Sequence, residues 1–239
     1  MKIKQLNKKP LFALAALLTS ITSTNVNAAE LEITVQNLTQ GIYYTPLIIA
    51  AHTGDAAMFR SGTMASPELQ ALAEGGDISS MASLLNSVSA DVNENAAGGL
   101  LAPGMSTSTM MSTSDSNMYL SLAAMLLPTN DGFVGLDSWM IPTEAGTYTF
   151  TLNAYDAGTE ANDEIVNGAG APGMPGIPAA PGMDAGMGAS GVIATEANSY
   201  VHIHPGTLGD DDEMGGKSDL NNAVHRWLNP VAKVTVVVK

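Results

Sequence analysis

The sequence predicts an antiparallel β-sandwich, because short runs of alternating apolar and polar residues recur from one end of the chain to the other. LEITVQN (31–37), TYTFTLNAY (147–155) and AKVTVVVK (232–239) alternate in this way. A period of two is typical of a strand with one buried face, and β-branched residues suit a pleated surface. NMYLSLAAMLL (117–127) and NSYVHIH (198–204) add two further strand candidates.

An export signal precedes these strands. Four lysines lie within the first nine residues, residues 11–21 form a short apolar core, and VNA (26–28) offers small residues for cleavage. The apolar core is too short to cross a bilayer, and no later segment reaches the roughly 20 apolar residues of a membrane helix. We therefore predict a signal peptide at 1–28 and one domain at 29–239, exported to the periplasm or the extracellular space, with no transmembrane segment in the mature chain.

Charge and cysteine content exclude several function classes. Residues 1–28 carry four of the nine basic residues and none of the 23 acidic ones, so cleavage changes the net charge from −14 to −18. Nucleic acids and anionic lipids are held by Lys and Arg, so neither is expected as a partner. The chain has no cysteine, which excludes disulfides, thiolate zinc sites and a cysteine nucleophile.

Three stretches interrupt the strand pattern. In ASPELQALAEGGD, Ser66 suits a helix N-cap, Pro67 the first helical position and Gly75 the stop, which predicts a short helix. GMSTSTMMSTSDS (104–116) is interpreted as a Ser/Thr/Met loop. The segment 168–191, rich in Gly, Ala, Pro and Met, is interpreted as a flexible loop inserted between strands.

A hairpin organises the acidic residues of the middle of the chain. Residues 133–141 and 147–155 form two strands around the turn PTEAG. If they pair along their length, Asp131 lies opposite the neighbourhood of Asp156, so the two carboxylates meet at the open end of the hairpin. Asp137 is six residues further along, about 20 Å away at roughly 3.3 Å per residue, and is expected to bind a neighbouring backbone group instead.

The loop after Asp156 adds Glu160, Asp163 and Glu164 to the same end. Calcium takes six to eight oxygen ligands and tolerates irregular loops, whereas magnesium fits less well. The alternatives are a solvated acidic loop and a carboxylate pair for glycoside hydrolysis. The latter needs an aromatic-lined groove, which is hard to build with 5% aromatic residues.

NDGFVGLDS followed by YDAGTEANDE resembles the paired motif of the spondin N-terminal domain, found in F-spondin, mindin and many secreted bacterial proteins. LTQGIYYTPLIIAAHTGDAAMFRSGTMASPELQALAEGGD and HRWLNPVAKVTVVV are similar to its flanks. The resemblance implies a sandwich of about eight strands, similar to calcium-dependent lipid-binding domains, with one or two short helices in crossing loops. It also implies a divalent cation held at Asp131, Asp156 and Glu160. Glu160 stands where animal members tend to have Asp, and the 168–191 segment has no counterpart in the family pattern.

Two other clusters leave alternatives open. YVHIHPG places His202 and His204 two residues apart, as in zinc or copper sites, but a third ligand such as His225 or His52 would have to join them. The alternative is a polar outer strand face that ends at His204. The acidic run Asp210–Glu213 is either a solvated turn or a second calcium site.

No G-x-S-x-G motif or phosphate-binding loop is present, so the chain is not expected to be an enzyme. The resulting hypothesis is a secreted, non-enzymatic, calcium-binding spondin-type domain. Its expected role is adhesion or binding, with a divalent cation and a cell-surface or extracellular protein or glycan as partners. The alternatives are a secreted or periplasmic hydrolase that uses the loop carboxylates, and a purely structural envelope protein.

Overall fold

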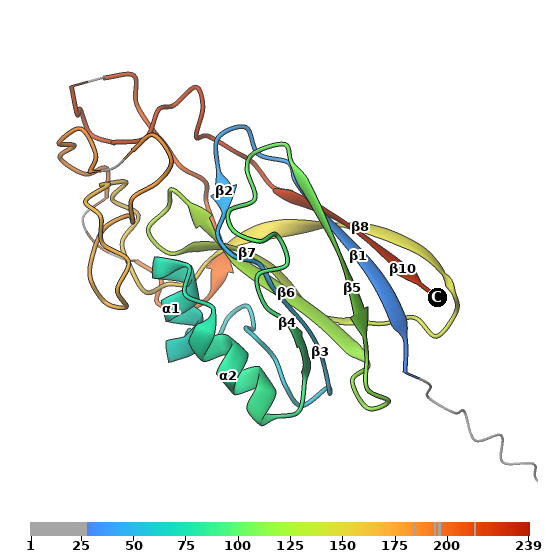
Figure 1. Cartoon of the computed structure of the whole chain (residues 1–239). Coiled ribbons are helices and arrows are strands. Elements are labelled where there is room, and N and C mark those ends of the chain that lie inside the picture. The colour runs from blue at the N-terminus through green and yellow to red at the C-terminus, as the bar shows by residue number, and fades with distance from the viewer. Residues whose placement is uncertain (1–27, 184, 194, 196, 213) are drawn as a thin grey trace, which may run out of the picture.

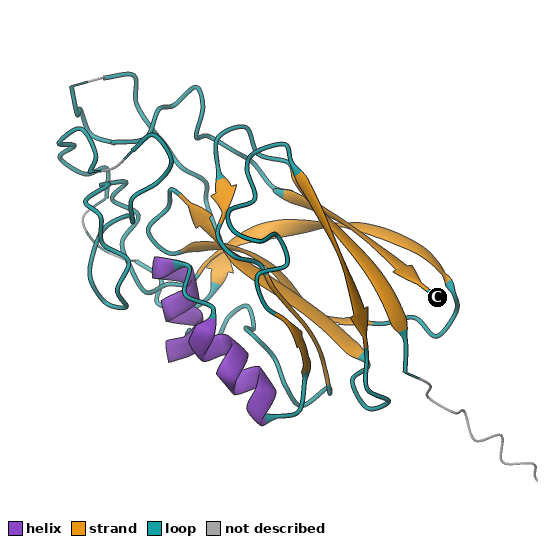
Figure 2. Ribbon diagram, in the orientation of Figure 1, coloured by secondary structure: helices purple, strands orange, loops and turns teal. Residues whose placement is uncertain are grey.

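The computed structural model describes residues 28–183, 185–193, 195, 197–212 and 214–239. Almost all of the predicted signal peptide lies outside these residues. The described chain confirms the predicted fold class: it is an antiparallel β-sandwich with two short helices (Figures 1 and 2).

Within the described residues, ten strands form one continuous, nearly closed sheet. The strands are β1 (Glu30–Asn37), β2 (Tyr43–Tyr44), β3 (Ile48–His52), β4 (Asp91–Asn93), β5 (Ser106–Ser112), β6 (Tyr119–Leu127), β7 (Gly132–Met140), β8 (Gly146–Asp156), β9 (His202–Ile203) and β10 (Ala232–Val238). The order is β4-β3-β6-β7-β8-β10-β1-β5, with β2 on β6 and β9 on β8. The first part of β8 pairs with β10 and its last four residues pair with β7, so β8 connects the two layers.

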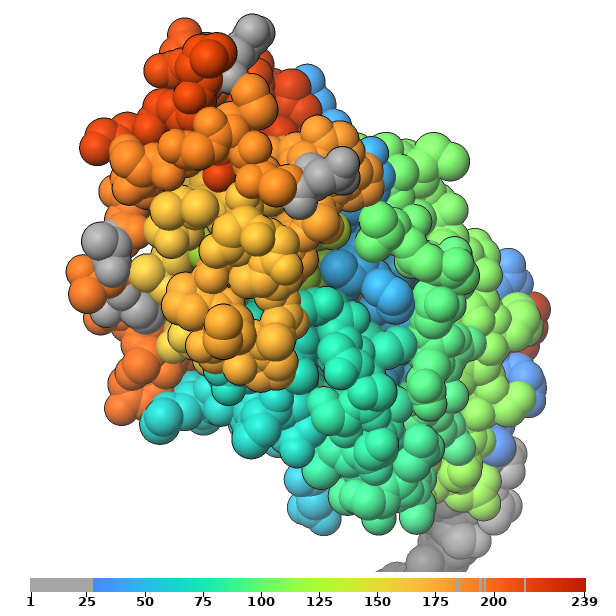
Figure 3. Space-filling model, turned by 60° about the vertical axis from the view of Figure 1, so that its left-hand side comes forward, coloured from blue at the N-terminus to red at the C-terminus, as the bar shows by residue number. Residues whose placement is uncertain are grey.

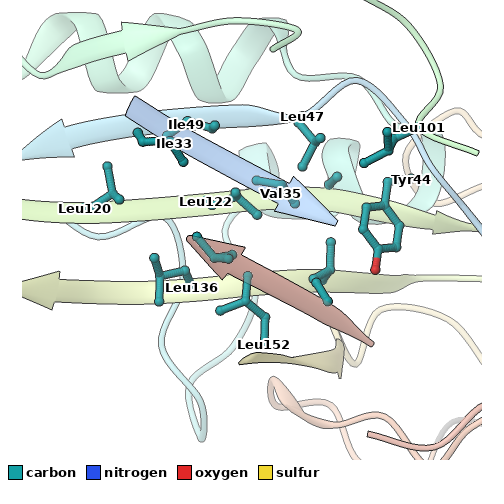
Figure 4. Packing of buried hydrophobic residues seen from close by; sticks show 14 of the residues in the cluster. Ile33, Val35, Tyr44, Leu47, Ile49, Leu101, Leu120, Leu122, Leu136 and Leu152 are labelled. Carbon is teal, nitrogen blue, oxygen red and sulfur yellow. The ribbon is translucent and has the colours of Figure 1, made fainter. Parts of the chain in front are cut away.

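The main core lies between the two layers. β1 contributes Ile33 and Val35, and they face Leu122 of β6 and Leu136 of β7 (Figure 4). β1 and β10 alternate in burial as the sequence predicts, because only one face of each strand is covered.

β6 is buried on both faces. Eight of its nine residues are buried, which explains why YLSLAAMLL reads as a continuous apolar run rather than an alternating one. Its second face packs, with Ile48 and Phe133, against the helices α1 (Pro67–Gly75) and α2 (Ser79–Ser87). Figure 1 shows both helices covering the face of the β3–β6–β7 layer.

Helix α1 begins and ends as predicted. Ser66 is the N-cap, its hydroxyl accepts a hydrogen bond from Leu69 N, and Pro67 is the first helical residue. The helix ends at Gly75, and Gly76 takes the left-handed conformation that glycine tolerates best. Helix α2 was not located from the sequence.

The Ser/Thr/Met stretch is not a loop, as the sequence was interpreted, but the strand β5. It pairs with β1 over seven residues and forms one edge of the sheet. The opposite edge, β4, reaches β5 and the residues that follow it. Asn93 Nδ2 donates to Thr109 Oγ1 of β5 at 2.6 Å, and the backbone N–H of Ser114, two residues beyond β5, donates to Asp91 Oδ2 at 2.6 Å. We call this contact the β4–β5 seam.

The irregular chain between β8 and β10 gathers at one end of the sandwich (Figure 1). The 168–191 segment contains no helix or ladder strand in its described residues, but it is not simply a free loop. Ile177 is fully buried and Ala180 nearly so, in a third cluster with Val166 and Leu220. The middle of the segment is therefore packed against the domain, whereas its composition predicted a flexible loop.

Candidate metal centre

The predicted register of the hairpin is confirmed at its open end, where the candidate ligands lie. Gly132 pairs with Asp156 and Gly135 with Asn153. Pairing over the whole length is wrong, because the rest of β8 pairs with β10 instead. β7 leaves β8 after Gly135, and Ser138 has a positive φ of 51°.

Asp131 lies in the turn before β7 and is fully buried. Its Oδ2 atom accepts hydrogen bonds from Thr159 N at 2.8 Å, Thr159 Oγ1 at 3.2 Å and Glu160 N at 3.1 Å. Its Oδ1 atom has no hydrogen-bond partner. The loop after β8 therefore folds over Asp131, and one buried carboxylate oxygen stays available.

Asp156, the last residue of β8, is also fully buried. Gly158 N donates to its Oδ1 atom at 2.8 Å and Asn162 Nδ2 to its Oδ2 atom at 2.7 Å. His202 Nδ1 lies 3.8 Å from Oδ1 and forms an ion pair when the imidazole is protonated.

Glu160 is 6% exposed and comes from the loop that covers Asp131. Its Oε2 atom accepts from Gly176 N at 3.1 Å and from Asn130 Nδ2 at 3.4 Å. Its Oε1 atom has no partner. Glu160 therefore has the same arrangement as Asp131, with one oxygen bound to the protein and one left over.

These carboxylates influence one another electrostatically. Burial, followed by the charge of Asp156, raises the pKa of Asp131 from 3.8 to about 7, against the lowering effect of its hydrogen bonds. Burial also raises the pKa of Glu160 to about 7, and the charges of Glu74 and Asp131 add to this rise. Removing charge from water costs free energy, so ionising this end of the domain is unfavourable without a counter-charge.

The residues fit a hard cation by chemistry, although they do not form a finished coordination shell. In the described part of the chain, no three His, Cys, Asp or Glu side chains lie close enough together to hold a metal ion. Two buried carboxylate oxygens without partners, Asp131 Oδ1 and Glu160 Oε1, are nevertheless the ligand type that calcium takes. A buried oxygen left unpaired is costly, which makes these two atoms the best-defined feature of the site.

The other acids of this region serve the fold. Asp163 Oδ1 accepts from Asn130 Nδ2 at 2.9 Å, and Glu164 accepts from the backbone of residues 208 and 209 and from Ser218 Oγ. Asp137 is exposed. Its predicted bond to the backbone is wrong, since its Oδ1 atom accepts from the Ser138 hydroxyl.

The histidines do not form a metal cluster among the described residues. His202 is half-buried beside Asp156, whereas His204 is buried against Trp227 with ring centroids 4.9 Å apart. The predicted polar outer face is therefore wrong for His204. His52 and His225 bind other groups, Ser121 Oγ and the backbone N of residue 221 respectively.

The described part of the Asp210–Glu213 run is irregular chain, and Asp210 forms an isolated bridge with Asn221. Asp210 accepts backbone hydrogen bonds from Asp212, Lys217 and Ser218, and these bonds lower its pKa. Glu213 lies outside the described residues.

Sequence reasoning missed Glu74 and Asn130. Glu74 is on α1 yet fully buried, and its charge acts on Glu160. Nothing in the helix pattern distinguishes it from a solvent-facing glutamate. Asn130 donates hydrogen bonds to both Glu160 and Asp163. Its position directly before Asp131 in the sequence was the one signal that could have identified it.

The fold and this acidic end define the class: a β-sandwich module whose loops gather buried carboxylates at one end. The family model for the spondin N-terminal domain, Spondin_N, matches residues 36–166, more than half of the chain and a range that contains Asp131, Asp156 and Glu160. The chain belongs to this family. The match ends before the 168–191 segment and β10. A search of curated proteins finds no match.

Neither helix of the described residues has the length and apolar character needed to cross a bilayer. Domains of the spondin N-terminal type are typically extracellular, which agrees in general terms with the predicted export.

Proposed function

We propose that this chain is a secreted, non-enzymatic spondin-type domain that binds calcium through Asp131, Asp156 and Glu160. It acts in adhesion or binding, in the periplasm or outside the cell, toward a cell-surface or extracellular protein or glycan. The observation that carries the proposal is the pair of buried, unpartnered oxygens on Asp131 and Glu160.

Charge compensation is the physical basis of the proposal. Like-charged carboxylates in a buried site raise one another's free energy, and a dication removes this penalty when it bridges them. Calcium suits irregular loops that supply carboxylate and carbonyl oxygens, whereas magnesium demands near-ideal octahedral geometry. Binding requires the three side chains to move closer together, so calcium should stiffen this end of the domain.

Burial argues against the hydrolase alternative. A raised pKa suits a general acid, but a general acid must reach substrate, and Asp131 and Asp156 are fully buried. A cavity of about 310 Å³ lies at the other end of β7, where Asp115, Met118 and Met140 line it. None of the three carboxylates lines that cavity.

Thermal unfolding of the secreted chain tests the proposal in calcium, magnesium and chelator. A ligand at 100 times its Kd stabilises the folded state by about 2.7 kcal/mol, which corresponds to a midpoint rise of roughly 5–10 °C for a domain of this size. Calcium should produce this rise, magnesium a smaller one, and Asp131→Asn or Asp156→Asn should abolish it.

Asp137→Asn is the matched control, because it removes the same charge from the exposed part of β7. It should leave the response to calcium intact. A midpoint that is the same in calcium and in chelator would contradict the proposal, and so would an equal response in Asp131→Asn.

A further inference from the structure

Part of the 168–191 segment rests on two buried carboxylates from different parts of the fold. Gly173 N donates to Glu74 Oε2 at 2.5 Å, and Gly176 N donates to Glu160 Oε2 at 3.1 Å. Figure 3 shows this segment, in yellow-orange, packed against the teal region that contains α1. The segment therefore contacts a candidate calcium ligand directly.

Residues 170–176 pack closely against the domain. A Cβ atom on Gly75, the last residue of α1, would lie 2.0 Å from Gly170 O, so helix and segment touch backbone to backbone. Gly176 has a φ of 117°, and a Cβ there would lie 2.2 Å from the Asn167 side chain. The glycines at these contacts are what allow the segment to lie so close to Glu74 and Glu160.

The charges under the segment are not balanced by the ion pairs found in the described chain, which join His202 to Asp156 and Lys239 to Glu32. The charge of Glu74 acts on Glu160 as a like charge. The amide groups of residues 173 and 176 offset part of this repulsion, and a cation at the proposed site would offset more.

The two oxygens of Glu160 have separate roles. Oε2 accepts from Gly176 N, whereas Oε1 has no partner, so a cation bound at Oε1 would not displace the amide. A cation bound at Oε1 would also hold the Glu160 side chain in one position, so that Oε2 stays within reach of Gly176 N. The cation would in this way support the contact that holds the segment.

We propose that calcium bound through Glu160 fixes residues 170–176 against α1 and that removing calcium releases them. This inference rests on the calcium site proposed above and adds its consequence for the surface. Release stops at Ile177, because that residue is fully buried and its N–H donates to Ile165 O at 2.8 Å. The surface that this end of the domain presents to a partner thus depends on the cation.

Amide hydrogen exchange on the folded wild-type chain, in calcium and in chelator, tests this inference. Calcium should slow exchange at Gly173 and Gly176 by about tenfold or more, because exchange there requires local opening. Exchange at Ile177 should change little, since its burial holds it in both conditions.

Two variants separate the causes. Asp131→Asn removes a calcium ligand and leaves the contact between Glu160 and Gly176 in place, so the effect of calcium on exchange should disappear. Glu74→Gln keeps an acceptor for Gly173 N and lies outside the three ligands, so the effect of calcium at Gly176 should persist.

Each result decides a separate point. Stabilisation by calcium with unchanged exchange at residues 170–176 overturns this inference and leaves the calcium site standing. No stabilisation and no change in exchange overturns both. Slowed exchange that survives in Asp131→Asn also overturns the inference, since calcium would then act without the site.

Discussion

Replacing Asp131 by Asn should stabilise the calcium-free protein at alkaline pH while it abolishes stabilisation by calcium. The pKa of Asp131 is raised from 3.8 to about 7, so the side chain is ionised at about pH 8 at a cost. At about 1.4 kcal/mol per pKa unit, that cost is at most on the order of 4 kcal/mol. Asn keeps an oxygen acceptor for the amides of Thr159 and Glu160, so we expect a gain of ~1–3 kcal/mol after its own burial is counted.

The sign of the pH dependence follows from proton uptake. Folded Asp131 holds its proton to higher pH than unfolded Asp131, so its contribution to stability is full below about pH 4 and is lost as pH rises through about 7. The advantage of the variant should therefore grow between about pH 5 and about pH 8. The pKa of Glu160 is also raised to about 7, so its contribution to stability changes with pH in the same direction in wild type and in the variant. This contribution therefore largely cancels when the two proteins are compared.

Urea denaturation of wild type and Asp131→Asn, in chelator at several pH values, measures this difference. Asp137→Asn is the control and should stay within about 0.5 kcal/mol of wild type, as exposed substitutions usually do. If Asp131→Asn is the less stable protein at about pH 8, the hydrogen bonds of the carboxylate outweigh its burial cost. That result would contradict a net cost of the buried charge on Asp131.

Three further outcomes are expected. Phe133→Ala should cost about 3–5 kcal/mol in urea denaturation, because Phe133 is fully buried against Phe59 with ring centroids 4.9 Å apart; a cost below about 1 kcal/mol would contradict this packing. Gly75→Ala places a methyl group against Gly170 O and should increase protease cleavage within 168–191 while the far-ultraviolet circular dichroism of the sandwich stays unchanged. Burial lowers the pKa of His204 to about 3, so its contribution to stability is present above about pH 6.5 and is lost as pH falls further. His204→Phe should reduce this loss of stability in acid. If the free energy of unfolding of the variant falls in acid as steeply as that of wild type, another group causes the loss.

The features that the sequence predicted correctly have local causes. The alternation in β1 and β10 reflects one covered face, and the start of α1 follows from the capping hydroxyl of Ser66. The register at the open end of the hairpin follows from the spacing around a single turn, and this register brought Asp131 and Asp156 together.

The features that the sequence did not predict depend on contacts between distant segments. β5 looked like a loop because two of its inward positions hold Thr107 and Thr109, whose hydroxyls hydrogen-bond to Ala96 O and Asn93 Nδ2 instead of joining an apolar core. The burial of His204, of Glu74 and of Ile177 likewise depends on where the irregular chain lies on the sandwich. No period or motif in the sequence specifies that arrangement.

The β4–β5 seam bears on whether copies of this protein can pair edge to edge. Both ends of the sheet meet there, and side chains from one edge occupy the approach to the other. Exposed edges are templates for strand exchange between copies, and charged or side-chain-blocked edges suppress it. Each edge of this sheet is approached by the other edge of the same molecule, and this arrangement opposes pairing with a second copy.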